Sequence, residues 1–233
     1  MLVDLTNSRK RAVRRVLQAN QSWYRRQRPS RLDAESYERI KRLLDVSVCL
    51  IILPVVAAMI ATMAIAIKID SPGPVFFHQV RTGKGGRRFK MYKMRTMVQD
   101  AEKLKGTFQH MNALRYPDFK IKDDPRVTRV GRFLRKTSLD ELPQIFNVLK
   151  GDMSLVGPRP TSFSVEHYQT WHTERLTVRP GITGLWQVCG RNKLQFDERL
   201  RLDIAYIRNR CLTLDLKILL RTILCVFTME GAN

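Results

Sequence analysis

The feature that most constrains the fold of this chain is an uncharged apolar run, VSVCLIILPVVAAMIATMAIAI, at residues 46–67. Its length matches the roughly 20 residues that an α-helix needs to cross the hydrocarbon core of a bilayer. The run begins too far into the chain, and lacks the cleavage signature, for a secretory signal peptide. We therefore expect a helix that enters a membrane.

Two observations bear on the path of that helix. Pro54 lies inside the run, where it removes a backbone hydrogen bond and kinks a helix. Lys and Arg outnumber Asp and Glu on both flanks, by 12 to 4 over residues 1–42 and by 30 to 17 over residues 43–233. Basic flanks are normally cytoplasmic. A re-entrant segment that bends at Pro54 and returns to the same face leaves both basic flanks in the cytoplasm. A spanning helix, the commoner outcome for such runs, leaves only one of them there.

The whole chain is strongly basic, with a formal net charge of +21. This excess points to an anionic partner, which is a nucleic acid, an anionic membrane surface or a phosphorylated substrate. The segments KRAVRR and WYRRQRPSR mix arginines with aromatic residues, as membrane-surface segments and single-strand-binding segments both do. The four cysteines show no C-x-x-C spacing, which favours buried thiols in a reduced, cytosol-facing compartment.

Local patterns predict a mostly helical α+β fold. The segment VFFHQVRTGKGGRRFKMYKMRTM predicts a β-hairpin with a glycine-rich connection, and residues 98–113 have a helical pattern. LPQIFNVLKG predicts a short amphipathic helix that ends at Gly151, and FDERLRLDIAYI predicts another helix. Near the C-terminus, LTLDLKILLRTILCVFTM predicts an amphipathic helix that lies on the core or on the bilayer surface.

An adjacent acid pair, Asp140 and Glu141, lies among many arginines. On a helical segment the preceding arginines would form one basic stripe, because they recur every three residues at Arg126, Arg129, Arg132 and Arg135. Arg159 and Arg179 follow in the rigid turns GPRP and RPGITG. Such arginines suit bidentate recognition of phosphate. A carboxylate among phosphates can bind Mg²⁺ or attack phosphorus, and the two acids can serve different partners because neighbours on a helix point about 100° apart.

The order of several motifs resembles one known family. KRLLDV, DSPGPVFF, FKMYKMRTM, DPRVTRVGRFLRKTSLDELPQ, GDMSLVGPRP and RPGITGLWQVCGRN occur in sequence. Together they are similar to the bacterial sugar transferases, the monotopic phosphoglycosyl transferases, from about Lys41 to about Phe227. Residues 1–38 are not covered by the resemblance, and their role stays open.

The resemblance implies a definite chemistry. Family members move a sugar-1-phosphate from a UDP-sugar to polyprenyl (undecaprenyl) phosphate, which initiates surface polysaccharide synthesis at the cytoplasmic face of the bacterial inner membrane. By this resemblance Asp140 is the nucleophile that forms an aspartyl-phosphosugar intermediate, and Glu141 binds the cofactor Mg²⁺. The family's membrane segment is a re-entrant hairpin kinked at a proline that matches Pro54. In this chain Leu53 stands where the family commonly has a serine, which weakens any claim of a serine hydrogen bond at the kink but not the claim of a bend.

The resemblance also implies site residues and a division of the chain. The expected substrate-binding residues are Arg95, Arg135, Arg159, Pro160, Arg179 and Arg191. The expected membrane-hairpin residues are Lys41, Arg42, Asp45 and Pro54. We expect a basic N-terminal extension over residues 1–38, a re-entrant membrane hairpin over 39–70, and a cytosolic catalytic domain with an interfacial C-terminal helix over 71–233.

Two alternatives remain open. The charge and the segment WYRRQRPSR would suit a membrane-anchored nucleic-acid-binding protein, but no recognition-helix or stacking motif accompanies them, so we expect no nucleic-acid partner. A non-catalytic scaffold of a polysaccharide assembly complex could keep the fold, but it would not need Asp140, Glu141, Arg135 and Arg159 together. The sequence leans by analogy toward hexose donors without naming the sugar, and it leaves open whether the chain forms a homo-oligomer.

Overall fold

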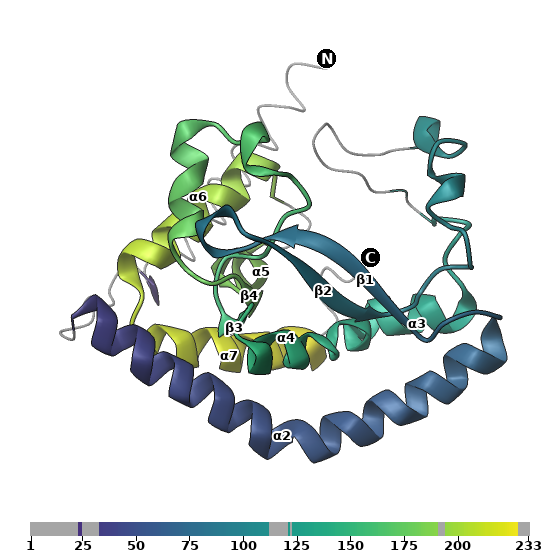
Figure 1. Ribbon diagram of the computed structural model, residues 1–233, viewed down its shortest axis with the longest axis horizontal. Coiled ribbons are helices and arrows are strands. Elements are labelled where there is room, and N and C mark those ends of the chain that lie inside the picture. Colours follow the sequence, from purple (N-terminus) through teal and green to yellow (C-terminus); the bar gives the residue numbers. More distant parts are fainter. Residues whose placement is uncertain (1–22, 25–32, 112–120, 122, 191–193, 228–233) are drawn as a thin grey trace.

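A computed structural model describes residues 23–24, 33–111, 121, 123–190 and 194–227. Its regular elements are α2 (Ala34–Asp70), β1 (Phe76–Thr82), β2 (Arg88–Met94), α3 (Arg129–Thr137), α4 (Gln144–Lys150), β3 (Ser154–Val156), β4 (Gly181–Thr183), α5 (Leu185–Cys189), α6 (Phe196–Asn209) and α7 (Leu212–Phe227). The long helix α2 runs along one edge of the molecule. The other elements all lie on the same side of α2 (Figure 1). The expected mostly helical α+β architecture is confirmed.

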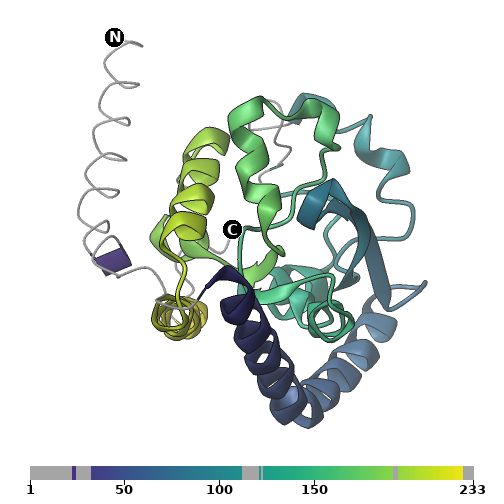
Figure 2. The ribbon, with the colours of Figure 1, turned by 60° about the vertical axis from the view of Figure 1, so that its left-hand side comes forward.

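Helix α2 contains the apolar run. The carboxylate of Asp33 caps its start by accepting hydrogen bonds from the backbone N–H groups of Glu35 and Ser36, at 3.0 and 2.9 Å. The helix bends near its middle, where Pro54 falls in the sequence, and both of its halves slope toward the rest of the molecule (Figures 1 and 2). Among the described residues it is the one helix long and apolar enough to cross a membrane.

The two faces of α2 differ in their contacts. One face is buried against α3, α4 and β3 at helical spacing, through Cys49, Val56, Ile60, Met63 and Ile67. The opposite face leaves large apolar side chains exposed, which are Leu43, Leu44, Leu50, Ile51, Val55, Ile65 and Ile69. An apolar surface of this extent on a long helix is suited to contact with lipid.

Polar contacts tie the first half of α2 to the remainder of the fold, and they use three of the expected membrane-hairpin residues. Lys41 Nζ lies 2.9 Å from Oδ2 of Asp215 on α7. Arg42 donates to the backbone carbonyls that end α4, including that of Leu149 at 2.8 Å. Asp45 accepts a 2.6 Å hydrogen bond from the Ser154 hydroxyl on β3. These contacts fix the angle at which α2 leaves the domain.

The predicted hairpin is confirmed as an antiparallel pair in which β1 and β2 are in register from Phe76↔Met94 to Thr82↔Arg88. The glycine-rich connection supplies the backbone that the turn requires, because Gly85 and Gly86 have φ of 64° and 79°. Directly opposed residues share a face of the hairpin. One face therefore carries Phe89 and Met91 into the core, and the other is exposed at Val80 and Lys90 in its middle.

A second, parallel pair places the turn that carries Arg159. Strands β3 and β4 align Ser154 with Gly181 and Val156 with Thr183. The backbones approach so closely that a Cβ on Gly181 would lie 2.1 Å from the backbone nitrogen of Gly157. Glycine is thus required where the GPRP and RPGITG turns meet.

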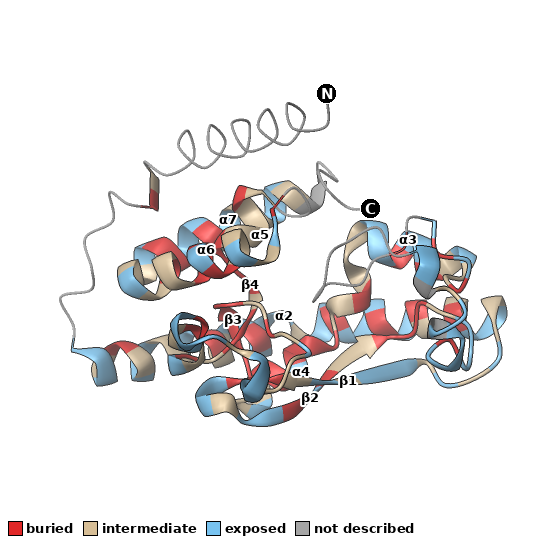
Figure 3. Ribbon diagram, turned by 90° about the horizontal axis from the view of Figure 1, so that it is seen from above, coloured by how far each residue is buried: buried red, intermediate tan, exposed pale blue. Residues whose placement is uncertain are grey.

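Three other predicted helices are confirmed. They are α4, which ends at Gly151 with φ of 92°, and α6 and α7. Helix α7 is amphipathic as expected, with Leu214 and Ile218 buried and a row of exposed apolar side chains at Leu216, Leu220, Ile223 and Leu224. Buried residues lie along β3 and β4 and on one side of α6 and α7 (Figure 3).

Two sequence expectations are wrong. Residues 98–111, the described part of the predicted helix 98–113, form turns and short 3₁₀ segments instead, and Asp100 has a left-handed φ of 65° that a helix cannot contain. The four-arginine stripe is also shorter than predicted, because α3 begins at Arg129. Arg126 precedes the helix and is buried in an ion pair with Asp124 at 2.7 Å.

Candidate active site

The acid pair lies on a short 3₁₀ turn, Leu139–Glu141, between α3 and α4. Ser138 ends α3 with a left-handed φ of 59°, and the turn that follows carries Asp140 inward, where it is buried. A 3₁₀ turn has three residues per turn, so the two neighbouring carboxylates point in different directions. The separation of roles expected for the two acids is thus geometrically available.

Glu141 is held by two cations. Arg159 donates to both of its carboxylate oxygens, with 2.9 Å from Nη1 to Oε2, and Lys93 Nζ lies 2.8 Å from Oε1. Burial by itself would raise the pKa of Glu141, but the charges of Arg159 and Lys93 outweigh it and hold that pKa well below its usual range. Glu141 is therefore a carboxylate at every physiological pH.

Asp140 has a different environment. Its nearest described cation is Lys93, whose Nζ lies 3.8 Å from Oδ2. Burial raises the pKa of Asp140 in spite of the opposing charges of Lys93, Arg135 and Arg159, and the charge of Glu141 raises it further. Asp140 is consequently the less strongly paired, more basic member of the pair, which suits a nucleophile.

Lys93, one of several basic residues in FKMYKMRTM, is the site residue that sequence reasoning missed. The pairing Phe77↔Lys93 puts it on the same face of the hairpin as Met91, and from there its ammonium group reaches both carboxylates. The period-two alternation of the strand could have found it, since Phe89, Met91 and Lys93 share the inward face.

Two of the predicted arginines lie near the acid pair. Arg159 contacts Glu141 directly, and its backbone carbonyl accepts a hydrogen bond from Arg175, which is itself paired with Asp203 at 2.7 Å. Arg135 acts on Asp140 through its charge and is oriented by a 2.9 Å hydrogen bond from its Nε to the Thr96 hydroxyl. Pro160 is buried directly after Arg159 and stiffens the turn.

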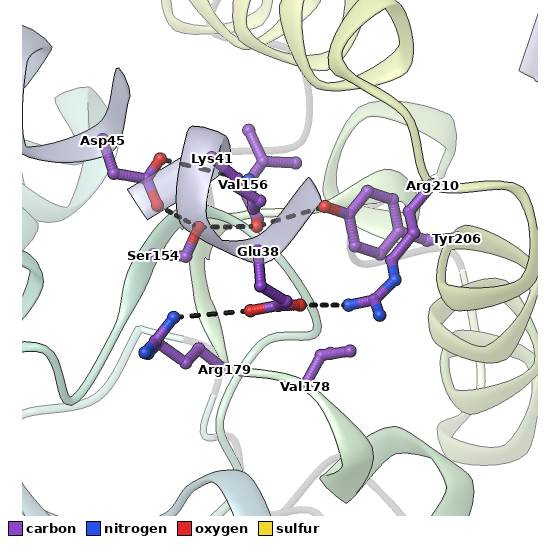
Figure 4. A pocket seen from close by; sticks show the side chains of 9 residues that line it. All are labelled: Glu38, Lys41, Asp45, Ser154, Val156, Val178, Arg179, Tyr206 and Arg210. Atoms are coloured by element: carbon purple, nitrogen blue, oxygen red, sulfur yellow. Dashed lines mark hydrogen bonds and ion pairs between the residues drawn. The ribbon is translucent and has the colours of Figure 1, made fainter. Parts of the chain in front are cut away.

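The structure does not bring the other predicted arginines to the acid pair. Arg95 is buried at the end of α2, where it donates to the backbone carbonyls of Pro72 and Ser71, at 2.7 Å for the latter. Arg179 lies in a pocket between α2 and α6, where it and Arg210 flank Glu38 (Figure 4). Arg191 lies outside the described residues.

The residues present are compatible with a Mg²⁺ ion that is completed by substrate. Among the described residues no group of three or more His, Cys, Asp or Glu could hold a metal by itself. Mg²⁺ commonly takes one or two carboxylates together with water and substrate phosphates. Oε2 of Glu141 accepts one described hydrogen bond, from Arg159, and so keeps acceptor capacity for a hard cation.

Fold and site together define a membrane-associated protein with an adjacent carboxylate pair, buried at Asp140, inside a cluster of cations. A model of the family described as bacterial sugar transferase matches residues 36–229, and the chain belongs to this family. Galactosyl transferase CpsE of Streptococcus agalactiae is 45% identical over 83% of this chain and 43% of its own length. The undecaprenyl-phosphate galactose phosphotransferase of Salmonella typhimurium is 43% identical over 83% of this chain and 41% of its own.

The chain therefore spans less than half the length of these two relatives. A relative of similar size is the exopolysaccharide production protein ExoY of Sinorhizobium fredii, which is 38% identical over 82% of this chain and 87% of its own length. The sequence-based family assignment is confirmed.

Proposed function

We propose that this protein is a phosphoglycosyl transferase that moves a hexose-1-phosphate from a UDP-sugar to polyprenyl phosphate through a covalent intermediate on Asp140. The observation that carries the proposal is the contrast within the acid pair. Asp140 is buried, and its nearest described cation, Lys93, lies 3.8 Å away. Glu141, in contrast, forms direct ion pairs with Arg159 and Lys93. The family and the printed names of the relatives from Streptococcus agalactiae and Salmonella typhimurium support the same class of reaction.

In the first step a carboxylate oxygen of Asp140 attacks the phosphorus that carries the sugar. A bond forms between that oxygen and phosphorus, the bond from phosphorus to the bridging oxygen breaks, and UMP leaves with the electron pair. Lys93 and Arg159, which contact the acid pair, would stabilise the negative charge that develops on the transferring phosphoryl group. An ionised Asp140 needs no separate general base for this attack.

In the second step an oxygen of the polyprenyl phosphate attacks the same phosphorus and releases the Asp140 carboxylate. The product is a polyprenyl-diphosphate sugar, the starting point of a surface polysaccharide. The exposed apolar face of α2 supports an acceptor that is embedded in lipid. The bend near Pro54 supports a re-entrant segment with both ends at the cytoplasmic face of the inner membrane, where nucleotide sugars are available.

Mg²⁺, when bound, supplies positive charge that stabilises the transferring phosphoryl group. Glu141 is the residue that would hold it, together with oxygens of the substrate diphosphate. Arg159 and Lys93 orient this carboxylate from two sides, so that its geometry is preorganised before the donor binds.

The proposal is tested by mass spectrometry of the intact protein after mixing it with UDP-hexose and Mg²⁺ in the absence of lipid acceptor. We expect a hexose-phosphate adduct that maps to Asp140 and disappears when polyprenyl phosphate is added. Asp140→Asn keeps the size but lacks the anionic oxygen, so it should form no adduct and lose at least about a thousandfold in turnover.

A set of UDP-sugars, scored by UMP release in the same assay, identifies the sugar. The two-step mechanism would be abandoned if Asp140→Asn still formed the adduct, or if the wild type released UMP only when donor and acceptor were both present. The second result would indicate direct transfer between the substrates.

A further inference from the structure

The inward face of the hairpin carries a second cation that the mechanism above does not use. The pairs Phe77↔Lys93, Gln79↔Met91 and Arg81↔Phe89 alternate along the ladder, and opposed residues share a face. Arg81 therefore lies on the same face as Lys93, further along β1. This face delivers two cations to the region of the acid pair.

Arg81 has no acidic partner among the described residues. One of its terminal nitrogens donates to Oε1 of Gln79 at 2.5 Å, and its Nε is buried with no hydrogen-bond partner. The charges that act on it most strongly are those of Arg159 and Glu141. Burial and the like charge of Arg159 lower the pKa of Arg81 to about 10. A half-buried guanidinium next to another guanidinium is unfavourable unless an anion joins them.

The neighbouring Arg88 is already occupied. Its guanidinium donates to the Thr82 hydroxyl at 2.6 Å and to the backbone carbonyls of Ser162 and Phe163 at 3.0 and 2.9 Å. Arg88 thus holds the loop that follows the GPRP turn. Within the described part of the chain the guanidinium of Arg81 donates to Gln79 alone, which leaves its other terminal nitrogen to donate to a ligand.

The charges that act on both Asp140 and Arg81 indicate which anion Arg81 faces. Lys93 approaches Asp140 to 3.8 Å, and Arg159 and Glu141 interact with both Asp140 and Arg81. Arg81 lies on the same face of the hairpin as Lys93, which approaches Asp140. A diphosphate whose sugar-bearing phosphorus is at Asp140 can therefore turn its nucleotide phosphate toward Arg81.

We propose that Arg81, oriented by Gln79, binds the nucleotide phosphate of the donor, the phosphate that departs as UMP. This inference rests on the proposed function. When the phosphorus–oxygen bond to the bridging oxygen breaks, the electron pair stays on the departing phosphate, and Arg81 and Arg159 lie beside that new charge. The described cations Arg81, Lys93, Arg135 and Arg159 exceed the carboxylates Asp140 and Glu141 by two, so these residues together favour an anionic donor.

The test compares Arg81→Gln with Lys90→Gln in the full chain in detergent. Lys90 is exposed and lies opposite Val80 on the outer face of the same hairpin. Its replacement by Gln removes the same charge as Arg81→Gln does. We expect Arg81→Gln to weaken UMP binding by about ten- to a hundredfold, the loss of a charge-assisted phosphate contact. Lys90→Gln should bind UMP as the wild type does. Uridine, which lacks the phosphate, should bind equally to all three proteins.

Product inhibition by UMP provides a second measurement of the same contact. Product inhibition by UMP should weaken in Arg81→Gln by the same factor as binding, and Arg81→Lys, which keeps the charge but not the planar fork, should be intermediate. If Arg81→Gln does not fold, judged by its thermal unfolding, then Gln79→Leu removes only the group that orients Arg81. That variant should weaken UMP binding by about fivefold, the loss of one oriented hydrogen bond.

The outcomes separate this inference from the proposed function. If the wild type releases UMP from a UDP-sugar and Arg81→Gln and Gln79→Leu bind UMP as tightly as the wild type, the assignment of Arg81 is wrong and the enzyme assignment stands. If the wild type neither binds UMP nor releases it from any UDP-sugar, both are overturned.

Discussion

At the scale of single residues, burial and charge divide two adjacent acids into different chemical groups. Glu141 is paired with Arg159 and Lys93, which hold its pKa low. Asp140 has Lys93 as its nearest described cation, at 3.8 Å, and burial keeps its pKa raised. Lys93 touches both acids and so sets the contrast between them. The same ammonium group that orients Glu141 also limits how far burial raises the pKa of Asp140.

Replacing Lys93 tests this balance. Asp140 must be ionised to attack, so activity is present above its pKa and is lost as the pH falls through it. Lys93 is the largest influence that lowers this pKa. Lys93→Met should therefore move the acidic limb of the kcat/KM profile to higher pH, in addition to reducing the rate.

The matched control is Lys90→Met, on the outer face of the same hairpin, which should leave the acidic limb where it is. An unchanged acidic limb in Lys93→Met would mean that Lys93 does not act on the ionisation of Asp140. The measurement is the pH dependence of UMP release at low donor concentration.

At the scale of elements, the contact between β3 and β4 decides where Arg159 stands. A Cβ on Gly181 would lie 2.1 Å from the nitrogen of Gly157 and 2.5 Å from the carbonyl oxygen of Thr183, and both are backbone atoms that cannot rotate away. The predicted turns GPRP and RPGITG were each readable from their prolines and glycines. That they pack against each other was not, because their contact joins segments more than twenty residues apart in the sequence.

Gly181→Ala is expected to destabilise the fold by about 1–3 kcal/mol, or several degrees in Tm, because the parallel ladder must separate to admit a methyl group. Turnover should fall by a larger factor than the loss of folded protein explains, since the separation displaces the turn that holds Arg159. Gly106→Ala is the control, because nothing lies within 4 Å of the added carbon. Equal Tm values for the two variants would contradict the close approach. Calorimetric or fluorescence-detected unfolding in detergent measures the difference.

At the scale of the whole molecule, the arrangement of α2 relates the site to the membrane. Its buried face packs on α3, α4 and β3, its first half is tied down by Lys41, Arg42 and Asp45, and its exposed face is apolar. The predicted division of the chain at residues 38 and 70 stays a prediction, as does the re-entrant path. The two halves of the bent helix both slope toward the domain, which favours that path over a straight span (Figure 2).

The topology is tested by labelling single cysteines introduced at Arg39 and at Lys84, which are exposed on either side of the apolar run. The background carries Cys225→Ser, because Cys49, Cys189 and Cys211 are buried. A membrane-impermeant maleimide should label neither site in intact cells and both sites in inverted vesicles. Labelling of the two sites from opposite sides would establish an ordinary spanning helix.

Pro54→Ala is the companion variant for the bend. It restores the backbone hydrogen bond that proline removes, which favours a straight helix. We expect a fraction of the molecules to present the two labelled sites on opposite faces. Identical labelling of Pro54→Ala and its parent would mean that the polar contacts of Lys41, Arg42 and Asp45 hold the path without the proline.

The sequence by itself determined the features that are written in consecutive residues. The uncharged run with its proline, the alternating strands around GKGG, the helix that ends at Gly151 and the adjacent acid pair are local patterns, and each appears in the structure. The helix predicted over residues 98–113 does not form in the described part of that segment. Asp100 has a left-handed φ there, which a continuous helix cannot contain even where the apolar periodicity is helical. Only the tertiary structure decided which cations reach the acids. It brought Lys93 and Arg159 to them and placed Arg81 nearby, whereas Arg95 caps α2 and Arg179 faces Glu38. Side-chain partners separated by tens of residues depend on how strands and helices pack, and one sequence carries no local signal for that packing.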